Sequence, residues 1–179
     1  SIEQRLRDVS GTPFDIQDDR RETRLILSEA SLKISNGDSD YVTVIQGFGE
    51  IVISDAGLMG AIGGTFAVAI PGVELDSNLN ILVNTTGEAS SDKFIVASDG
   101  TTREGIEAGN FFQAVGEHIN LKIAGQELSG NIFLRNEILD EGSTITLLGL
   151  SKVSASFGDG NTTFLSLSKG SGILRVTSA

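Results

Sequence analysis

Apolar residues along most of this chain recur at every second position, the period of a strand with one face buried in a sheet. Four segments show the alternation clearly: Ile51–Ile53, Phe66–Ile70, Leu79–Val83 and Ile119–Ile123. Each segment would turn one apolar face toward a core and one polar face toward water. The pattern predicts antiparallel strands of roughly 5 to 8 residues joined by short turns.

Turn-forming dipeptides separate the alternating segments. They are Asn36-Gly37, Ala56-Gly57, Pro71-Gly72, Asp99-Gly100, Ala124-Gly125 and Asp159-Gly160. Helical patterning is confined to Ile2–Arg7 and Thr102–Ala108, both too short to be stable helices alone. A parallel α/β fold would need longer crossover helices. The sequence therefore predicts an all-β fold of antiparallel hairpins or meanders, packed as a sandwich or roll, with little or no helix.

Two distant parts of the chain carry the same pattern. When the sequence is shifted by 123 residues, so that Ser28 lies on Ser151, seven of thirty positions are identical, where chance among common residues gives roughly two. The identities pair Leu27 with Leu150, Ser28 with Ser151, Ser31 with Ser154, Gly37 with Gly160, Gly47 with Gly170, Gly49 with Gly172 and Ala56 with Ala179. The match indicates a repeated unit of about 123 residues.

The alternation changes phase at the same place in both copies. In the first copy, apolar residues occupy odd positions up to Leu27 and even positions from Ala30 onward. The second copy makes the same change between Leu150 and Val153. A shift of one residue turns every later side chain to the opposite face of the sheet, so we predict a β-bulge or bend at both places.

A shorter internal repeat relates Phe66–Asn84 to Ile119–Glu137 at an offset of 53 residues. Both segments have the order strand, glycine turn, strand. We therefore divide the chain into three parts. Residues 1–26 are an N-terminal segment with the end of a preceding repeat, residues 27–149 are a full β repeat unit, and residues 150–179 begin the next repeat.

The order of four segments resembles a known group of proteins. The segments are GDGNTTFLSLSKGSGIL, AGLMGAIGGTFAVAIPGVEL, ILVNTTGEA and HINLKIAGQELSGNIFL. Together, over residues 27–179, they resemble the tandem β-rich repeats of very large secreted or surface bacterial proteins, the adhesin-like and RTX-associated exoproteins. The resemblance implies a structural or adhesive role, an extracellular or cell-surface location, and neighbouring repeats of the same chain as partners. It carries no catalytic residues with it, and the calcium nonapeptide G-G-x-G-x-D of RTX proteins is missing from this chain.

Composition narrows the classes of function. The net charge of −11 argues against nucleic acid as a partner, because no cation excess is present to displace phosphate counterions. Without Cys the chain forms no disulfides and no thiolate metal sites. Its apolar runs fall short of the ~20 residues of a membrane helix. We expect no enzyme activity, no cofactor and no membrane span.

Three acidic residues are candidates for calcium: Asp38 and Asp40, at alternate positions, and Asp159. The glycine and the distal Glu of an EF-hand loop are absent around them. Asx turns account for Asp38 and Asp159 without a metal. Calcium is therefore an alternative rather than an expected ligand.

Other sites have a functional and a structural interpretation. Gly47-x-Gly49 lacks the third glycine and the helix of a nucleotide-binding turn, so we expect a bulge or a close approach of strands. His118 has no second His or Cys with which to complete a zinc site, and we expect it at the surface, at a strand start. Glu74 and Glu127 occupy equivalent positions of the shorter repeat. They are either a glycosidase pair or charges that deter edge pairing, and we favour the second because equivalent positions tend to lie a module apart.

Three further segments have sequence features that could indicate a modification or a binding site. The sequences Asn84-Thr85-Thr86 and Asn161-Thr162-Thr163 match N-glycosylation acceptors, and we expect polar turns there. Ser98–Asn110 lies outside the alternating pattern, and its Arg103 and Glu107 are candidates for ligand binding. The sequence thus supports a structural or adhesive module that acts as a spacer or scaffold. The alternative is a β module that binds carbohydrate or another surface ligand, with calcium assisting in one form of that hypothesis.

Overall fold

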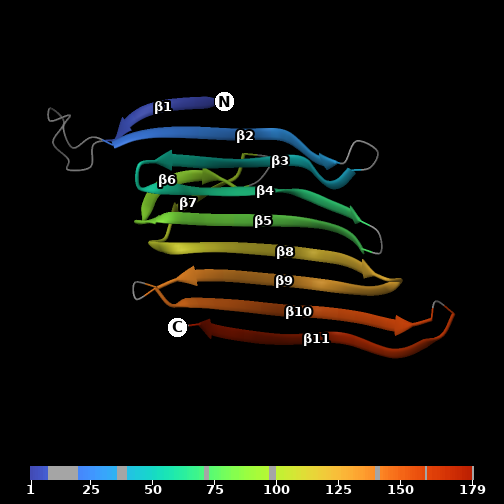
Figure 1. Ribbon diagram of the computed structural model, residues 1–179. Helices are drawn as coiled ribbons and strands as arrows, with labels where there is room; N and C mark the ends of the chain where they lie inside the picture. The colour runs from blue at the N-terminus through green and yellow to red at the C-terminus, as the bar shows by residue number, and fades with distance from the viewer. Residues whose placement is uncertain are drawn as a thin grey trace.

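The computed structural model describes residues 1–7, 20–35, 40–70, 73–96, 100–139, 142–159 and 161–178. Nine strands form one antiparallel sheet and two form a separate small sheet (Figure 1). The strands are β1 (Ile2–Arg7), β2 (Arg20–Ser35), β3 (Asp40–Ser54), β4 (Gly57–Ile70), β5 (Val73–Gly87), β6 (Ser90–Ile95), β7 (Thr102–Ile106), β8 (Gly109–Ile123), β9 (Gln126–Ile138), β10 (Thr144–Gly158) and β11 (Thr163–Ser178). The described residues contain no helix, and the predicted all-β class is confirmed.

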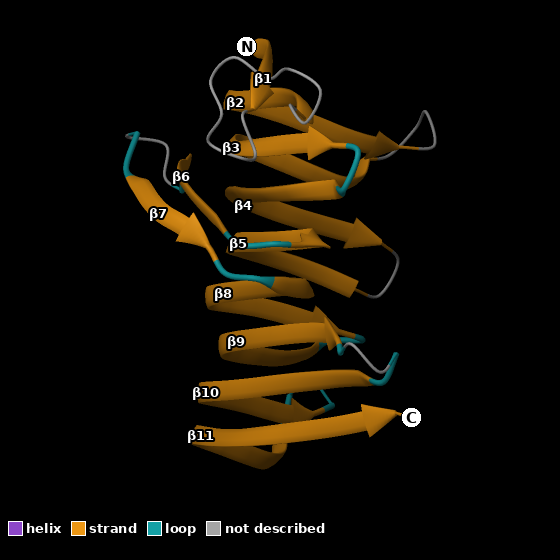
Figure 2. Ribbon diagram, turned by 90° about the vertical axis from the view of Figure 1, so that its left-hand side faces the viewer, coloured by secondary structure: helices purple, strands orange, loops and turns teal. Residues whose placement is uncertain are grey.

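The main sheet is a meander with one insertion. Its strands follow chain order, except that β5 pairs directly with β8. The hairpin β6–β7 is inserted at that point and lies beside the main sheet (Figure 2), where β6 contacts β3 and β4. The insertion therefore covers part of one face of the sheet without interrupting its hydrogen-bonded ladder.

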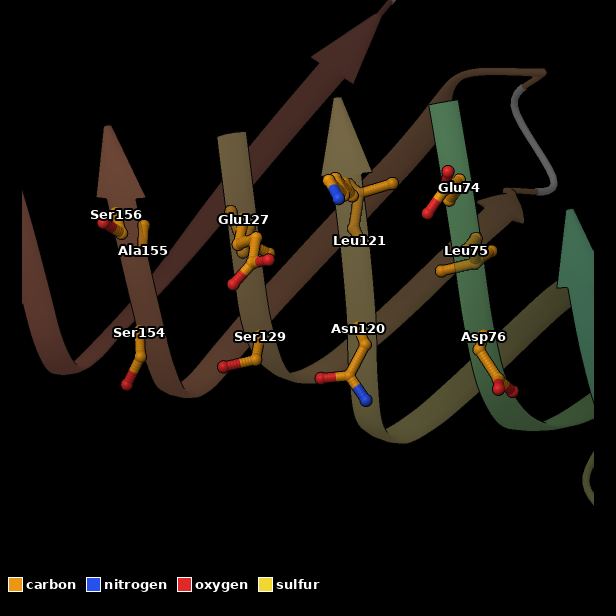
Figure 3. A pocket seen from close by; sticks show the side chains of 12 residues that line it. Glu74, Leu75, Asp76, Asn120, Leu121, Glu127, Ser129, Ser154, Ala155 and Ser156 are labelled. Carbon is orange, nitrogen blue, oxygen red and sulfur yellow. The ribbon is translucent and has the colours of Figure 1, made fainter. Parts of the chain in front are cut away.

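The long strands bend at a line of bulges, which interrupts the register of every ladder between long strands except that of β4 with β5. The strands β2 to β5 and β8 to β11 have 13 to 16 residues, so the predicted length of about 5 to 8 was wrong. The bulges change the phase of the apolar pattern but do not end the pairing of the strands, so each half had the appearance of a separate strand. Figure 3 shows the bends in neighbouring strands, which fold the sheet into two arms.

Both predicted bulges are present. The register of β2 shifts between Leu27 and Ala30, and that of β10 shifts between Leu150 and Val153. Matching shifts occur in the adjacent strands, for example between Ile45 and Phe48 in β3. The change of phase in the sequence is therefore the signature of the bend line.

The hairpins β2–β3 and β10–β11 have the same register. Each Cα partner pair of β2 and β3 has its counterpart 123 residues later in β10 and β11, bulges included. For example, Glu22↔Ser54 corresponds to Ile145↔Thr177, and Leu27↔Gly49 corresponds to Leu150↔Gly172. The two hairpins are thus the same structural element at the residue level.

The best-buried core lies between the inserted hairpin and the sheet. Phe94 of β6 and Ile106 of β7 are 0% and 1% exposed. The side chains of the same core cluster on the main sheet are Val52, Met59, Ala61, Leu82 and Phe111. Burying Phe94 and Ile106 stabilises the hairpin by about 2 to 3 kcal/mol each. The hairpin is therefore part of the fold rather than a surface loop.

The two segments with helical patterning are strands, which agrees with the expectation of little or no helix. Ile2–Arg7 is β1, and most of Thr102–Ala108 is β7. Both segments are too short for a helix to persist alone, and pairing with β2 and β6 satisfies their backbone groups instead.

The predicted turn at Ala124-Gly125 is confirmed. Both residues have positive φ, 49° and 82°, and they join β8 to β9 as a two-residue hairpin loop of the type I′ class. The turn at Ala56-Gly57 is also confirmed, with Asp55 and Ala56 between β3 and β4. The dipeptides Asn36-Gly37 and Pro71-Gly72, together with Asp99 and Gly160, lie outside the described residues.

Candidate functional site

A groove of about 540 Å³, lined by polar and apolar residues, crosses one arm of the sheet (Figure 3). Directly opposite residues of β5, β8, β9 and β10 form two polar rows along it, with a row of apolar residues, Leu75, Leu121, Leu128 and Ala155, between them. One row is Asp76, Asn120, Ser129 and Ser154, and the other is Glu74, Lys122, Glu127 and Ser156. Residues two positions apart on a strand share a face, so both rows belong to the same surface. The groove offers carboxylates, hydroxyls, an amide and one ammonium group to a ligand.

The groove brings Glu74 and Glu127 together, which corrects the expectation that they lie a module apart. They are on β5 and β9, with Lys122 of β8 directly between them in the register. The two halves of the shorter repeat are thus neighbours in one meander. Both residues are on inner strands of the sheet, so the prediction that their charges deter pairing at a sheet edge was wrong as well. Both are exposed, whereas the acid of a glycosidase is typically enclosed.

An arginine ties the inserted hairpin to the sheet. Arg24 of β2 forms ion pairs with Asp92 of β6, at 2.6 Å, and with Glu50 of β3. The side chain of Glu50 is only 4% exposed, so Arg24 supplies the opposite charge that a buried carboxylate needs. The pattern of apolar residues does not reveal this ion-pair cluster, because Asp92 meets Arg24 only through the fold.

Asn84 fixes both ends of the same hairpin. It is fully buried, and its Nδ2 donates hydrogen bonds to the carbonyl oxygens of Glu88 and Glu107, each at 2.8 Å. Its Oδ1 accepts hydrogen bonds from the backbone N–H and the hydroxyl of Thr86, at 2.9 and 2.8 Å. The expected polar turn at Asn84-Thr85-Thr86 was therefore wrong: these residues belong to β5, and Asn84 is a buried anchor.

The structure does not bring Arg103 and Glu107 into one site. Arg103 lines a cavity of about 330 Å³ between hairpin and sheet, and its Nε donates to the carbonyl of Gly105 at 3.1 Å. Glu107 instead forms an ion pair with Arg135, at 2.6 Å. Arg135 also pairs with Glu137 and lies over the ring of Phe111, 4.0 Å from its centroid. Burial alone would lower the pKa of Arg135, but the hydrogen bonds to the two glutamates outweigh it and raise the pKa.

Of the calcium candidates, only Asp159 has a described side chain. Its Oδ1 accepts hydrogen bonds from the backbone N–H groups of Asn161 and Thr162, at 2.9 and 2.7 Å, which confirms the expected Asx turn. These bonds lower the pKa of Asp159 below its ordinary value of 3.8. Asp38 lies outside the described residues, and Asp40 is the first residue of β3. Within the described ranges, no group of three or more His, Cys, Asp or Glu is placed to hold a metal ion.

His118 is exposed, as expected, but it lies inside β8 rather than at a strand start. It sits at the bulge of that strand with φ of 54°. Its backbone N–H donates to Oδ1 of Asn131, at 3.0 Å. In the shorter repeat, the equivalent residues Thr65 and Asn78 make a similar bond of 2.8 Å through the Thr hydroxyl. His118 is therefore a part of the bend.

The glycines of Gly47-x-Gly49 serve the packing of strands, as expected. Gly47 is opposite Ala30 at the bulge, and a Cβ on Gly49 would lie 2.3 Å from the carbonyl oxygen of Ala61 in β4. Gly172 is the counterpart of Gly49 in β11, but no atom of the described ranges lies within 4 Å of the place its Cβ would take. The same glycine thus has a close neighbour in β3 and none in β11.

The outer edge of β11 is unpaired among the described strands. Six large apolar residues of this strand are exposed: Phe164, Leu165, Leu167, Ile173, Leu174 and Val176. Natural proteins usually protect the edge of a sheet with charges, prolines or bulges. An apolar edge of this length is a surface suited to binding another strand.

Comparisons of the chain with protein-family models, with curated proteins and with solved structures found no match. In the part of the chain that the structure describes, no helix has the length and apolar character needed to cross a membrane.

Proposed function

We propose that this protein is a structural module that acts as a spacer or scaffold in a tandem array, and that its sheet continues from one module into the next. The observation that carries the proposal is the common register of β2–β3 and β10–β11. In the first pair, β3 continues the sheet by pairing with β4. In the second pair, β11 is in the position of β3 and would pair with the β4-type strand of the next module.

Gly172 and the apolar edge support this proposal. In β3, Gly49 leaves room for the close approach of β4. Among the residues that the structure describes, Gly172 has no comparable neighbour, but it would leave the same room for a strand paired with β11. The exposed apolar residues of β11 would be covered by the continuation of the sheet.

Such an array gains length by adding strands side by side. One unit of 123 residues, from β2 to the start of β10, contributes six strands to the main sheet. At about 4.8 Å between strands, one unit extends the sheet by roughly 29 Å. Each unit contacts only its neighbours, so stability is local and length is set by the number of repeats. By its resemblance to surface exoproteins, we place the array outside the cell or on its surface, in an adhesive protein.

The experiment is to extend the chain by one unit. Residues 57–179 are appended once more after Ala179, which places a second copy of Gly57–Ile70 where it can pair with β11. We expect a folded protein whose largest dimension in small-angle X-ray scattering exceeds that of the original chain by about 29 Å. The control carries Ala61→Pro and Ala67→Pro in the appended copy, which remove ladder hydrogen bonds and should leave the added segment unfolded. An added segment that is equally disordered in both proteins would contradict the proposal.

The groove across β5, β8, β9 and β10 favours a second candidate function, the binding of a carbohydrate or another hydroxyl-rich surface ligand. Its rows of carboxylates, hydroxyls and one ammonium group offer hydrogen bonds to such a ligand. A glycan array should then show binding that is lost in Glu127→Gln and retained in Glu104→Gln, which lies outside the groove. A calcium-assisted form of this function predicts a higher melting temperature in millimolar calcium than in EDTA.

A further inference from the structure

The hairpin β6–β7 contacts one face of β2–β3, and the corresponding face of β10–β11 has a different arrangement of charged residues. In the first pair, Arg24 is directly opposite Val52. In the second pair, the corresponding residues are Leu147 and Arg175, again directly opposite one another. The arginine and the aliphatic residue have therefore exchanged strands. The face keeps one cation, but places it on β11 instead of on the inner strand.

The acidic residue of this face is also replaced. Glu50, which pairs with Arg24, corresponds to Ile173, which is 85% exposed. Among the residues that the structure describes, no ion pair is formed by Arg175. Within the described part of the chain, the result is a guanidinium without a carboxylate and an exposed isoleucine on the same face, in a protein with a net charge of −11.

The equivalent face of the first pair shows what covers such a surface. There the hairpin β6–β7 lies against β3 and β4, and Asp92 of the hairpin pairs with Arg24. The apolar side chains of the hairpin, Phe94 and Ile106, are part of the core on that face. A carboxylate for the arginine and apolar side chains for the strands thus come from one element.

We propose that the face formed by Leu147, Ile173 and Arg175 is a docking surface for a β6–β7-type hairpin of a neighbouring repeat, whose acidic residue pairs with Arg175. This inference rests on the proposed function, because the hairpin comes from the next module of the array. The carboxylate of the hairpin supplies an ion-pair partner that Arg175 does not have among the described residues, and the apolar residues of the hairpin cover Ile173. The hairpin then locks two modules together across their junction.

The extended chain described above tests the pairing, because its appended copy carries a second hairpin. We compare Arg175→Met, Asp92→Leu in the appended copy only, and the two changes together, each by its melting temperature. Arg175→Met should lower the melting temperature on the order of 2 to 4 °C when the appended Asp92 is present, and little when it is Leu. In the original chain, Arg175→Met should change little. Glu104→Gln in the appended copy is the matched control, and it should show no coupling to Arg175.

The outcomes separate this inference from the proposed function. If the appended unit does not fold, the proposed function fails and the inference fails with it. If the unit folds but Arg175→Met has the same effect with and without the appended Asp92, only the docking of the hairpin is overturned. If the original chain forms a dimer that Ile173→Glu dissociates, a second copy covers this face and the inference is likewise overturned.

Discussion

Glu29 of β2 and Lys152 of β10 share the left-handed backbone conformation, with φ of 51° and 54°, although they are 123 residues apart in the chain. Each is the residue at which its strand bends. Gln46 and Lys169, in the partner strands β3 and β11, show the same agreement at 53° and 56°. The two hairpins therefore reproduce each other down to unusual backbone angles, which residues with side chains rarely adopt.

Replacing Lys152 with Gly should stabilise the protein. A residue with a Cβ is strained at φ of 54°, and glycine is not, so we expect a gain of about 1 kcal/mol in the free energy of unfolding. Lys152→Val should destabilise, because a branched side chain is least tolerated there. Ser151→Gly, one position earlier, is the control and should cost about 0.5 to 1 kcal/mol. Urea denaturation measures the free energy of unfolding of all three variants. A loss of stability in Lys152→Gly would contradict the claim that the backbone of Lys152 is strained.

The equivalent glycines Gly49 and Gly172 should respond in opposite ways to Ala. In Gly49→Ala the new Cβ would meet the carbonyl oxygen of Ala61 at 2.3 Å, and we expect a loss of about 2 to 4 kcal/mol. Gly172→Ala meets no atom within 4 Å and should be neutral or slightly stabilising. In the extended chain, Gly172→Ala should become as harmful as Gly49→Ala. If Gly172→Ala is harmless in both proteins, a strand does not pair with β11 as β4 pairs with β3.

Arg24→Met should destabilise the protein more than the loss of its two ion pairs alone suggests. It leaves the buried carboxylate of Glu50 without its cation, which costs about 3 to 5 kcal/mol. Adding Glu50→Gln should restore a large part of that loss, because the uncompensated charge is removed. Lys93→Met breaks the exposed pair with Glu104 and should change little. Thermal unfolding compares the variants, and an equal effect of Arg24→Met and Lys93→Met would contradict the role of Arg24.

Acid should loosen the turn between β10 and β11. The pKa of Asp159 is lowered in the folded protein, so its ionised form contributes stability above pH 3.8, and this contribution is lost as the pH falls through the lower folded pKa. The amide signals of Asn161 and Thr162 should report the titration by NMR, with a midpoint below 3.8. Asp159→Asn keeps an acceptor oxygen and should make the two signals independent of pH in this range. A midpoint at or above 3.8 would contradict the hydrogen bonds of the turn.

The bends of the sheet could be predicted from the sequence, because a bulge changes the phase of the alternation of apolar residues. The apolar positions change from odd at Leu27 to even at Ala30, and the structure places a register shift between these residues. The turn at Ala124-Gly125 was visible in the sequence because it contains glycine, and Gly125 adopts a positive φ at no steric cost. The length of the strands was not visible, because the same change of phase resembles the end of a strand.

The inserted hairpin could not be predicted, because its strands are too short to show a period. Its two buried apolar residues, Phe94 and Ile106, acquire that role from the sheet beneath them. The anchor Asn84 has the sequence of a glycosylation acceptor, and its partners at Glu88 and Glu107 meet it only in the fold. Local sequence thus reports bulges and turns, whereas tertiary anchors depend on contacts between distant residues.

Hydrogen exchange of the β11 amides tests the central claim most directly. In the original chain, the amides of residues 163–178 that point away from β10 should exchange rapidly, because β11 is an edge strand. In the chain extended by residues 57–179, the same amides should be protected as strongly as those of β3 that face β4. Protection of this kind, lost when the appended copy carries Ala61→Pro and Ala67→Pro, is the result we predict. Rapid exchange at the β11 edge in a folded extended chain would contradict the continuation of the sheet.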